Sequence, residues 1–162
     1  MKIYTSYFGQ LRNFKTKNII PISTTAGGWP WWLYKSYTKK QGSCFLNENN
    51  IMLGIWEDKF SCANLFEKLE EKCSKNCLYR NKVPHCQFMD AYLNYLRTID
   101  INYFLNEFNR VAEEVRKVTK FEGEAIILLM VYEGKECNCA ERPCIQQYFR
   151  ENNIEITEWN NN

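Results

Sequence analysis

The segment Ala125–Val131 is apolar at every position, and it constrains the fold more than any other part of the chain. A continuous apolar run of this length is typical of a strand that is covered on both faces of a sheet. A helical pattern over Arg142–Asn152 and an alternating pattern over Ile154–Trp159 follow it. This order predicts a βαβ unit, whose right-handed crossover places the helix on one face of the sheet.

Patterns upstream of this unit predict the remaining elements. Alternation predicts strands over Lys2–Phe8 and Ile19–Ser23, and Pro21 favours an edge or a bulge for the second. The stretch Trp31–Asn50 has no clean period and indicates irregular structure. Apolar residues at helical spacing predict three helices, the last of them capped by Asp100: Asn64–Lys72, Phe88–Leu96 and Asp100–Val118.

The order of these elements predicts a three-layer α/β domain with a small, mainly parallel sheet, and the length of the chain fits one such domain. The 162 residues, 45% hydrophobic and 25% charged, exclude a disordered or fibrous chain. We expect the domain to cover residues 1–159, with an insert at about 56–86 and a disordered tail at 160–162. No apolar segment could span a bilayer or act as a secretory signal, so we expect a cytoplasmic protein without a membrane partner. The oligomeric state stays open.

Eight cysteines in a chain expected in the cytoplasm favour metal binding or thiol reactivity over disulfides. Cys44 and Cys62 stand alone and fit small core positions. The other six form two triplets: Cys73, Cys77 and Cys86, and Cys137, Cys139 and Cys144. A thiolate metal site needs about four ligands, so either His85 completes the first triplet around a structural ion such as zinc, or the two triplets share one ion. Unligated thiols are the alternative for both triplets.

The loop after the apolar strand is the candidate site. In open α/β sheets, ligands bind beyond the carboxyl ends of the strands. This loop runs into a helix N-terminus, which favours an anion and the thiolate form of a nearby cysteine. We therefore expect Cys139 and Arg142 to form an anion site, in which Glu133 transfers a proton or fixes Arg142. In the structural alternative, Cys137 and Cys139 only shape a tight loop and Arg142 pairs with Glu155 or Glu158.

The first 47 residues are basic and aromatic. They hold seven Lys or Arg and no Asp or Glu, although the whole chain carries a net charge of only +2. Aromatic faces beside phosphate-binding charges suit a nucleotide or a nucleic acid. Against this, tryptophans commonly pack over a sheet edge, and the small net charge is not typical of a nucleic-acid binder. The candidate ligand-binding residues here are Ser23, Trp29, Trp31, Lys35 and Arg12.

Two stretches resemble the domain of unknown function 488 family of small cytosolic bacterial and phage proteins. Ile3–Phe8 with Ile19–Ser23 is similar to the family's opening strand and its second strand, which leads into a Pro/Trp-containing loop. The later stretch is similar to the family's apolar strand, its Cys-His-Arg loop and its closing helix and strand. It consists of Leu128–Glu133, Cys139–Arg142, Tyr148 and Ile154–Trp159.

This chain departs from the family pattern at two points. Val131 stands where the family has a strand-end cysteine, and the histidine of the Cys-His-Arg loop is absent. Glu133, Cys139 and Arg142 carry over, whereas Trp56–Cys86 has no counterpart. The resemblance implies an α/β fold and a site that handles nucleotides or nucleic acids, without naming a reaction.

Two functions follow from these features. The leading one is a cysteine/arginine anion site that binds or processes a nucleotide or a nucleic-acid-derived ligand. The alternative is a non-enzymatic, metal-stabilised module that binds a nucleic acid or a protein partner. Residue patterns alone leave open whether the chain is an enzyme.

Overall fold

The computed structural model describes residues 1–25, 29, 39–41, 44–46, 51–60, 87–134 and 140–160. The N-terminal half contains β1 (Lys2–Tyr7), the 3-10 helix η1 (Phe8–Asn13), β2 (Ile19–Ser23), β3 (Lys39–Gln41), β4 (Cys44–Leu46), β5 (Met52–Trp56) and the 3-10 turn η2 (Asp58–Phe60). The C-terminal half contains α3 (Gln87–Leu96), α4 (Ile101–Thr119), β6 (Ile126–Val131), α5 (Glu141–Glu151) and β7 (Thr157–Glu158).

The strands form one sheet in the order β3-β4-β5-β2-β6-β1-β7. The five strands from β5 to β7 are parallel, and β3 and β4 extend the sheet antiparallel at the β5 side. The apolar strand β6 lies between β1 and β2, and β1 separates it from β7. The predicted α/β class, with a mainly parallel sheet and a C-terminal βαβ unit, is confirmed.

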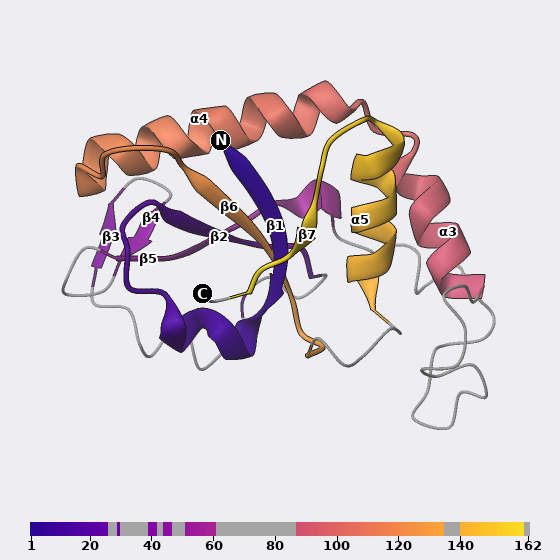
Figure 1. Ribbon diagram of the computed structural model, residues 1–162, viewed down its shortest axis with the longest axis horizontal. Helices are drawn as coiled ribbons and strands as arrows, with labels where there is room; N and C mark the ends of the chain where they lie inside the picture. Colours follow the sequence, from indigo (N-terminus) through magenta and orange to yellow (C-terminus); the bar gives the residue numbers. More distant parts are fainter. Residues whose placement is uncertain are drawn as a thin grey trace.

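The two faces of the sheet are covered differently. Ile127 and Leu129 of β6 belong to a core that also contains side chains of α3, α4 and α5, whereas Leu128 and Met130 pack with η1 and Trp29. Figure 1 shows α4 along one side of the sheet and η1 on the other. We call these the helix face and the η1 face. Because β6 is buried on both, every position of its sequence is apolar.

Helix α4 shows how the sequence sets its own boundaries. Asp100 is the N-cap, as predicted, and its carboxylate accepts a hydrogen bond from the Asn102 N–H at 2.9 Å. The helix buries one stripe of its surface and ends where Lys120 adopts a left-handed conformation, with φ of 56°. The buried stripe consists of Phe104, Phe108, Val111, Ala112, Val115 and Thr119.

Three expectations about strands were wrong. Trp31–Asn50 contains β3 and β4, whose three residues each are too few for alternation to be visible. β2 is an interior strand, but its ladder with β5 covers only Ile22 and Ser23, so Pro21 has a paired neighbour on the β6 side alone. The predicted strand Ile154–Trp159 shortens to Thr157–Glu158, where β7 pairs with β1.

Part of the predicted insert belongs to the core. Phe60 is completely buried and stacks on Phe104, with 4.1 Å between the ring centroids. The predicted helix Asn64–Lys72, Cys62 and the tail residues 161–162 lie outside the described residues, and nothing is described of the Cys44 side chain. None of the described helices combines the length and the apolar character needed to span a membrane.

Candidate functional site

The ends of three parallel strands meet at one edge of the sheet. Ser6 of β1 and Ser23 of β2 are both in register with Met130 of β6, so the three side chains form a row on the η1 face. We call residues 6–7, 23–25 and 130–134 the carboxyl edge. The chain leaves β6 for α5 on the helix face, whereas after β1 and β2 it passes η1 and Trp29 on the η1 face. Open α/β sheets bind ligands at such a switch in direction.

Hydroxyl groups are concentrated at this edge. Ser6, Ser23 and Thr24 are completely buried, and Thr25 is nearly so. The N–H and the hydroxyl of Thr24 both donate to the Met130 carbonyl, at 3.1 and 3.0 Å, and the hydroxyl oxygens of Ser23 and Thr25 lie 3.2 Å apart. Ser6 Oγ is buried without a hydrogen-bond partner. Ser23 therefore lies at the predicted edge, and β6 separates it from Ser6, whose hydroxyl makes no hydrogen bond.

Trp29, a predicted ligand-binding residue, is buried on the η1 face. Its ring contacts Phe8, with centroids 5.3 Å apart, and lies so close to Gly54 that a Cβ there would stand 1.9 Å from Trp29 Cζ2. This packing agrees with the alternative expectation that the tryptophans of this segment pack against the sheet. The indole Nε1, however, is buried and makes no hydrogen bond. An unsatisfied buried donor costs roughly 1–3 kcal/mol of stability. The ring of Trp29 therefore stabilises the fold by packing, while its unpaired N–H destabilises it.

The guanidinium of Arg142 is buried and binds other groups of the protein. Its side chain is only 6% exposed, and Nη1 donates to Glu158 Oε1 at 2.9 Å. Nη2 donates to the carbonyl oxygens of Glu133 and Gly134, at 2.8 and 2.6 Å. The second carboxylate oxygen of Glu158 accepts from the Thr5 hydroxyl at 2.7 Å. The alternative pairing with Glu158 is thus confirmed, and Glu133 meets Arg142 through its main chain.

Exposed basic residues lie in η1 and in the segment that follows it. Arg12 lies exposed in the last turn of η1, and Lys15 and Lys17 follow it before β2 begins. No acidic residue occurs before Glu48. Not all seven early charges lie at the carboxyl edge, because Lys2 at the opposite end of β1 pairs with Glu124 at 3.6 Å.

Several predicted site residues lie outside the described residues. They are Cys139 of the anion site, the candidate ligand-binding residues Trp31 and Lys35, Cys137 of the second cysteine triplet, and Cys73, Cys77, His85 and Cys86 of the metal site. Within the part of the chain that is described, no group of three or more His, Cys, Asp or Glu side chains is placed to hold a metal ion. The metal hypothesis therefore stays a prediction.

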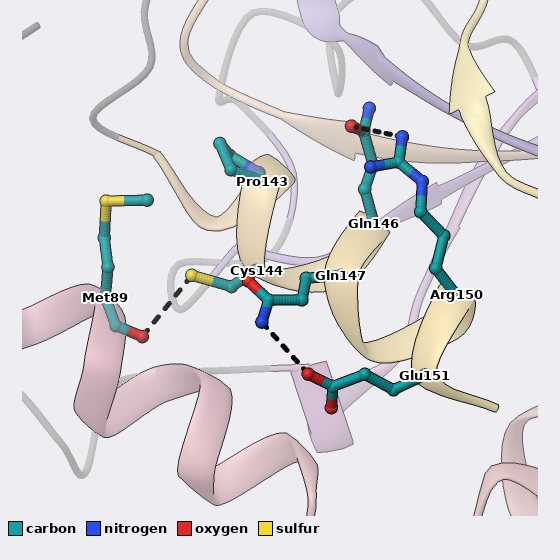
Figure 2. A pocket seen from close by; sticks show the side chains of 7 residues that line it. All are labelled: Met89, Pro143, Cys144, Gln146, Gln147, Arg150 and Glu151. Carbon is teal, nitrogen blue, oxygen red and sulfur yellow. Dashed lines mark hydrogen bonds between the residues drawn. The ribbon is translucent and has the colours of Figure 1, made fainter. Parts of the chain in front are cut away.

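Cys144, the last residue of the second triplet, lines a groove between α3 and α5. The groove has a volume of about 520 Å³ (Figure 2). The Cys144 thiol is buried and donates to the Met89 carbonyl at 3.4 Å. At the rim, Gln147 donates to Glu151 at 3.0 Å and Arg150 to Gln146 at 3.3 Å, so these polar groups engage one another. The groove belongs to the helix layer, away from the unused donors of the η1 face.

Sequence reasoning missed three residues at the strand ends. Besides Ser6, these are Glu57 and Tyr132. Glu57 is buried after β5, and its Oε1 accepts from the Lys59 N–H at 3.0 Å and the Tyr103 hydroxyl at 3.2 Å. Tyr132 follows β6 and is 54% exposed. Each is polar or aromatic where a parallel strand ends, and that position is the signal that could have found them.

Comparison with known proteins gives no relative for this chain: no family model, no curated protein and no solved structure matches it. The resemblance to the domain of unknown function 488 family therefore stays a prediction that rests on the quoted motifs.

Proposed function

We propose that the chain binds a nucleotide, or a nucleotide unit derived from a nucleic acid, at the carboxyl edge on the η1 face. The observation that carries the proposal is that two of the described buried donors without hydrogen-bond partners, Ser6 Oγ and Trp29 Nε1, lie on this face. Both belong to the face on which Met130 and Ser23 lie. Phosphate and sugar oxygens are acceptors that would satisfy such donors and recover the cost of leaving them unpaired.

The charge distribution supports an anionic ligand at this place. Arg12 lies exposed in the last turn of η1, whereas Lys15 and Lys17 lead to the amino end of β2, where Asn18 contacts the main chain of Glu124. The two carboxylates of Glu57 and Glu158 are bound by groups on the helix face, namely Tyr103 of α4 and Arg142 of α5. Two of the carboxylates at the strand ends are therefore turned away from a phosphate on the η1 face.

The start of α5 adds a second favourable group. Its N-cap, Ala140, makes no side-chain capping hydrogen bond, and the contacts of Arg142 with Glu133 and Gly134 hold this helix end beside the end of β6. The positive end of the helix dipole thus lies near the carboxyl edge, where it stabilises negative charge.

Two residues of the predicted site take different roles in this proposal. Arg142 positions the edge, because its guanidinium already binds Glu158 and two carbonyl groups. Chemistry on the ligand is assigned to Cys139, which directly precedes Ala140, with proton transfer by Glu133. A Cys139→Ser variant should bind the nucleotide unchanged but fail to turn it over, and a loss of binding would contradict this assignment.

Calorimetric titration with nucleoside monophosphates tests the binding proposal. We expect Ser6→Ala and Thr25→Val to weaken binding about fivefold each, because each loses a hydroxyl at the site. Thr119→Val is the matched control, since Thr119 is also buried but bonds the Val115 carbonyl in α4. The proposal fails if no nucleotide binds the unaltered chain at millimolar concentration, or if the control loses as much affinity as the two site variants.

A further inference from the structure

Tyr132 is the one large aromatic side chain among the described residues of the carboxyl edge that is mostly exposed, at 54%. It directly follows β6, the strand whose end lies between Ser6 and Ser23. We propose that Tyr132 is the base-stacking residue of the nucleotide site. This inference rests on the function proposed above and adds to it the group that recognises the base.

The ring of Tyr132 is held from behind and open in front. It meets the ring of Phe8 edge to face, with 4.8 Å between centroids and 80° between planes. Phe8 is buried and contacts Trp29, which in turn lies on Gly54 of β5. The exposed tyrosine thus ends a chain of packed rings that is anchored in the sheet. A ring fixed in this way loses little conformational freedom when a base stacks on it.

The position of this ring fits the rest of the ligand. Tyr132 contacts Phe8, so it lies toward the same face as the unpaired donors Ser6 Oγ and Trp29 Nε1. A nucleotide carries its base and its phosphate at opposite ends of the sugar. The carboxyl edge offers the aromatic ring of Tyr132 to the base and the hydroxyl of Ser6 to the sugar or the phosphate. Stacking tolerates any base, because every base has an aromatic face.

Tyr103 is another exposed tyrosine, and its contacts differ from those of Tyr132. It is 38% exposed, but its hydroxyl donates to Glu57, its ring packs edge-on against Phe104 and Lys59 Nζ lies 5.4 Å from its centroid. Its ring thus belongs to the helix face, opposite to Phe8 and Tyr132. Tyr103→Ala is therefore a control for the loss of an exposed tyrosine.

Two probes separate the base from the phosphate: adenosine 5′-monophosphate and ribose 5-phosphate. We expect Tyr132→Ala to weaken adenosine monophosphate binding about tenfold, whereas Tyr132→Phe keeps it, because the phenyl ring stacks equally well. Ribose 5-phosphate should bind the unaltered chain and Tyr132→Ala alike. Tyr103→Ala should leave both affinities unchanged.

The possible failures are distinguishable. If the unaltered chain binds neither probe, the proposed function is overturned and the stacking role with it. If adenosine monophosphate binds the unaltered chain and Tyr132→Ala equally well, only the stacking role is overturned. Equal weakening of both probes by Tyr132→Ala would also overturn it, because a stacking residue acts on the base alone.

Discussion

Arg142 Nη1 donates to Glu158 Oε1 across 2.9 Å, and this contact fastens the last strand to the fold. Strand β7 has two residues and pairs only with Tyr4 and Thr5 of β1, so its ladder alone offers little stability. Gln146 and Arg150 lie at successive four-residue steps from Arg142 along α5 and donate to Thr5 Oγ1 at 2.7 Å and the Ile156 carbonyl at 3.2 Å. Side chains on one face of α5 therefore hold β7 and the residue before it, through Arg142 and Arg150, and the adjacent β1, through Gln146.

Removing this clamp should destabilise the protein. We expect Arg142→Ala to lower the free energy of unfolding by about 3 kcal/mol, because it leaves Glu158 partly buried without its cation and two carbonyls without their donor. Arg142→Lys should recover little, since an ammonium cannot reproduce the guanidinium geometry. Urea unfolding measures the loss. Arg110→Ala, at an exposed pair with Glu107, is the control and should cost about 0.5 kcal/mol.

Gly54 should tolerate no side chain. Its φ of +148° disfavours other residues, and Trp29 occupies the space of a Cβ. We expect Gly54→Ala to cost about 3 kcal/mol, from both the backbone strain and the displaced ring. Gly123→Ala is the matched control, because Gly123 has φ of +82° with open space around it, and about 1 kcal/mol of strain is expected. Equal thermal shifts in the two variants would contradict the close approach of Trp29.

The Ser6 hydroxyl should lower the stability of the unliganded protein. Its buried hydroxyl makes no hydrogen bond, so Ser6→Ala removes an unsatisfied group and should stabilise the unliganded chain by about 1 kcal/mol. For a chain of this length, that corresponds to a rise of about 2–4 °C in Tm. Differential scanning calorimetry measures it. A drop in Tm would mean that the hydroxyl is satisfied in the unliganded protein, contrary to the binding proposal.

The lowered pKa of Glu151 should make the stability of the fold depend on pH. Hydrogen bonds from the Arg97 guanidinium and then Gln147 lower its pKa to about 2. A carboxyl with a lowered pKa stabilises the fold above its unfolded value, and that contribution disappears as the pH falls toward 2. Glu107 and Glu124 also have lowered pKa values, through Arg110 and the N-terminal ammonium, so the unaltered chain must be compared with Glu151→Gln.

Urea midpoints of the unaltered chain and Glu151→Gln should therefore differ at pH 7 and converge between pH 4.5 and 2. Because this pair is exposed, the difference should be small and should shrink further in high salt. A constant difference across this pH range would exclude the ion pair with Arg97 as its cause.

The parts of the fold that the sequence predicts are those with long, regular patterns. The apolar β6, the capped α4 and the βαβ order were predictable because burial on two faces, an Asp N-cap and a helical stripe each leave a local signal. β3 and β4 were not, because three residues cannot show a period. The edge or bulge predicted from Pro21 was wrong. Its missing N–H would matter only where a second strand pairs with it, and the β5 ladder begins at Ile22.

The candidate site was predictable in its location but not in its contacts. Parallel strands bring their ends together, which places Ser23 and the segment after Val131 at one edge from topology alone. The sequence indicated an ion pair of Arg142 with Glu155 or Glu158 only as an alternative, because these residues lie on different elements that only the closed fold brings together. The positions of Ser6 and Tyr132 at strand ends are visible in the sequence, but the missing hydrogen bond of Ser6 and the exposure of Tyr132 are tertiary properties.

A heteronuclear NMR titration with adenosine 5′-monophosphate tests the central claim most directly, because it locates the ligand. The binding proposal predicts that the largest shifts occur at the amides of residues 6–7, 23–25 and 131–134 and at the indole N–H of Trp29. That indole signal should move downfield as it gains an acceptor. Shifts confined to the groove beside Cys144, or an indole signal of Trp29 that stays in place at saturation, would contradict a nucleotide site at the carboxyl edge.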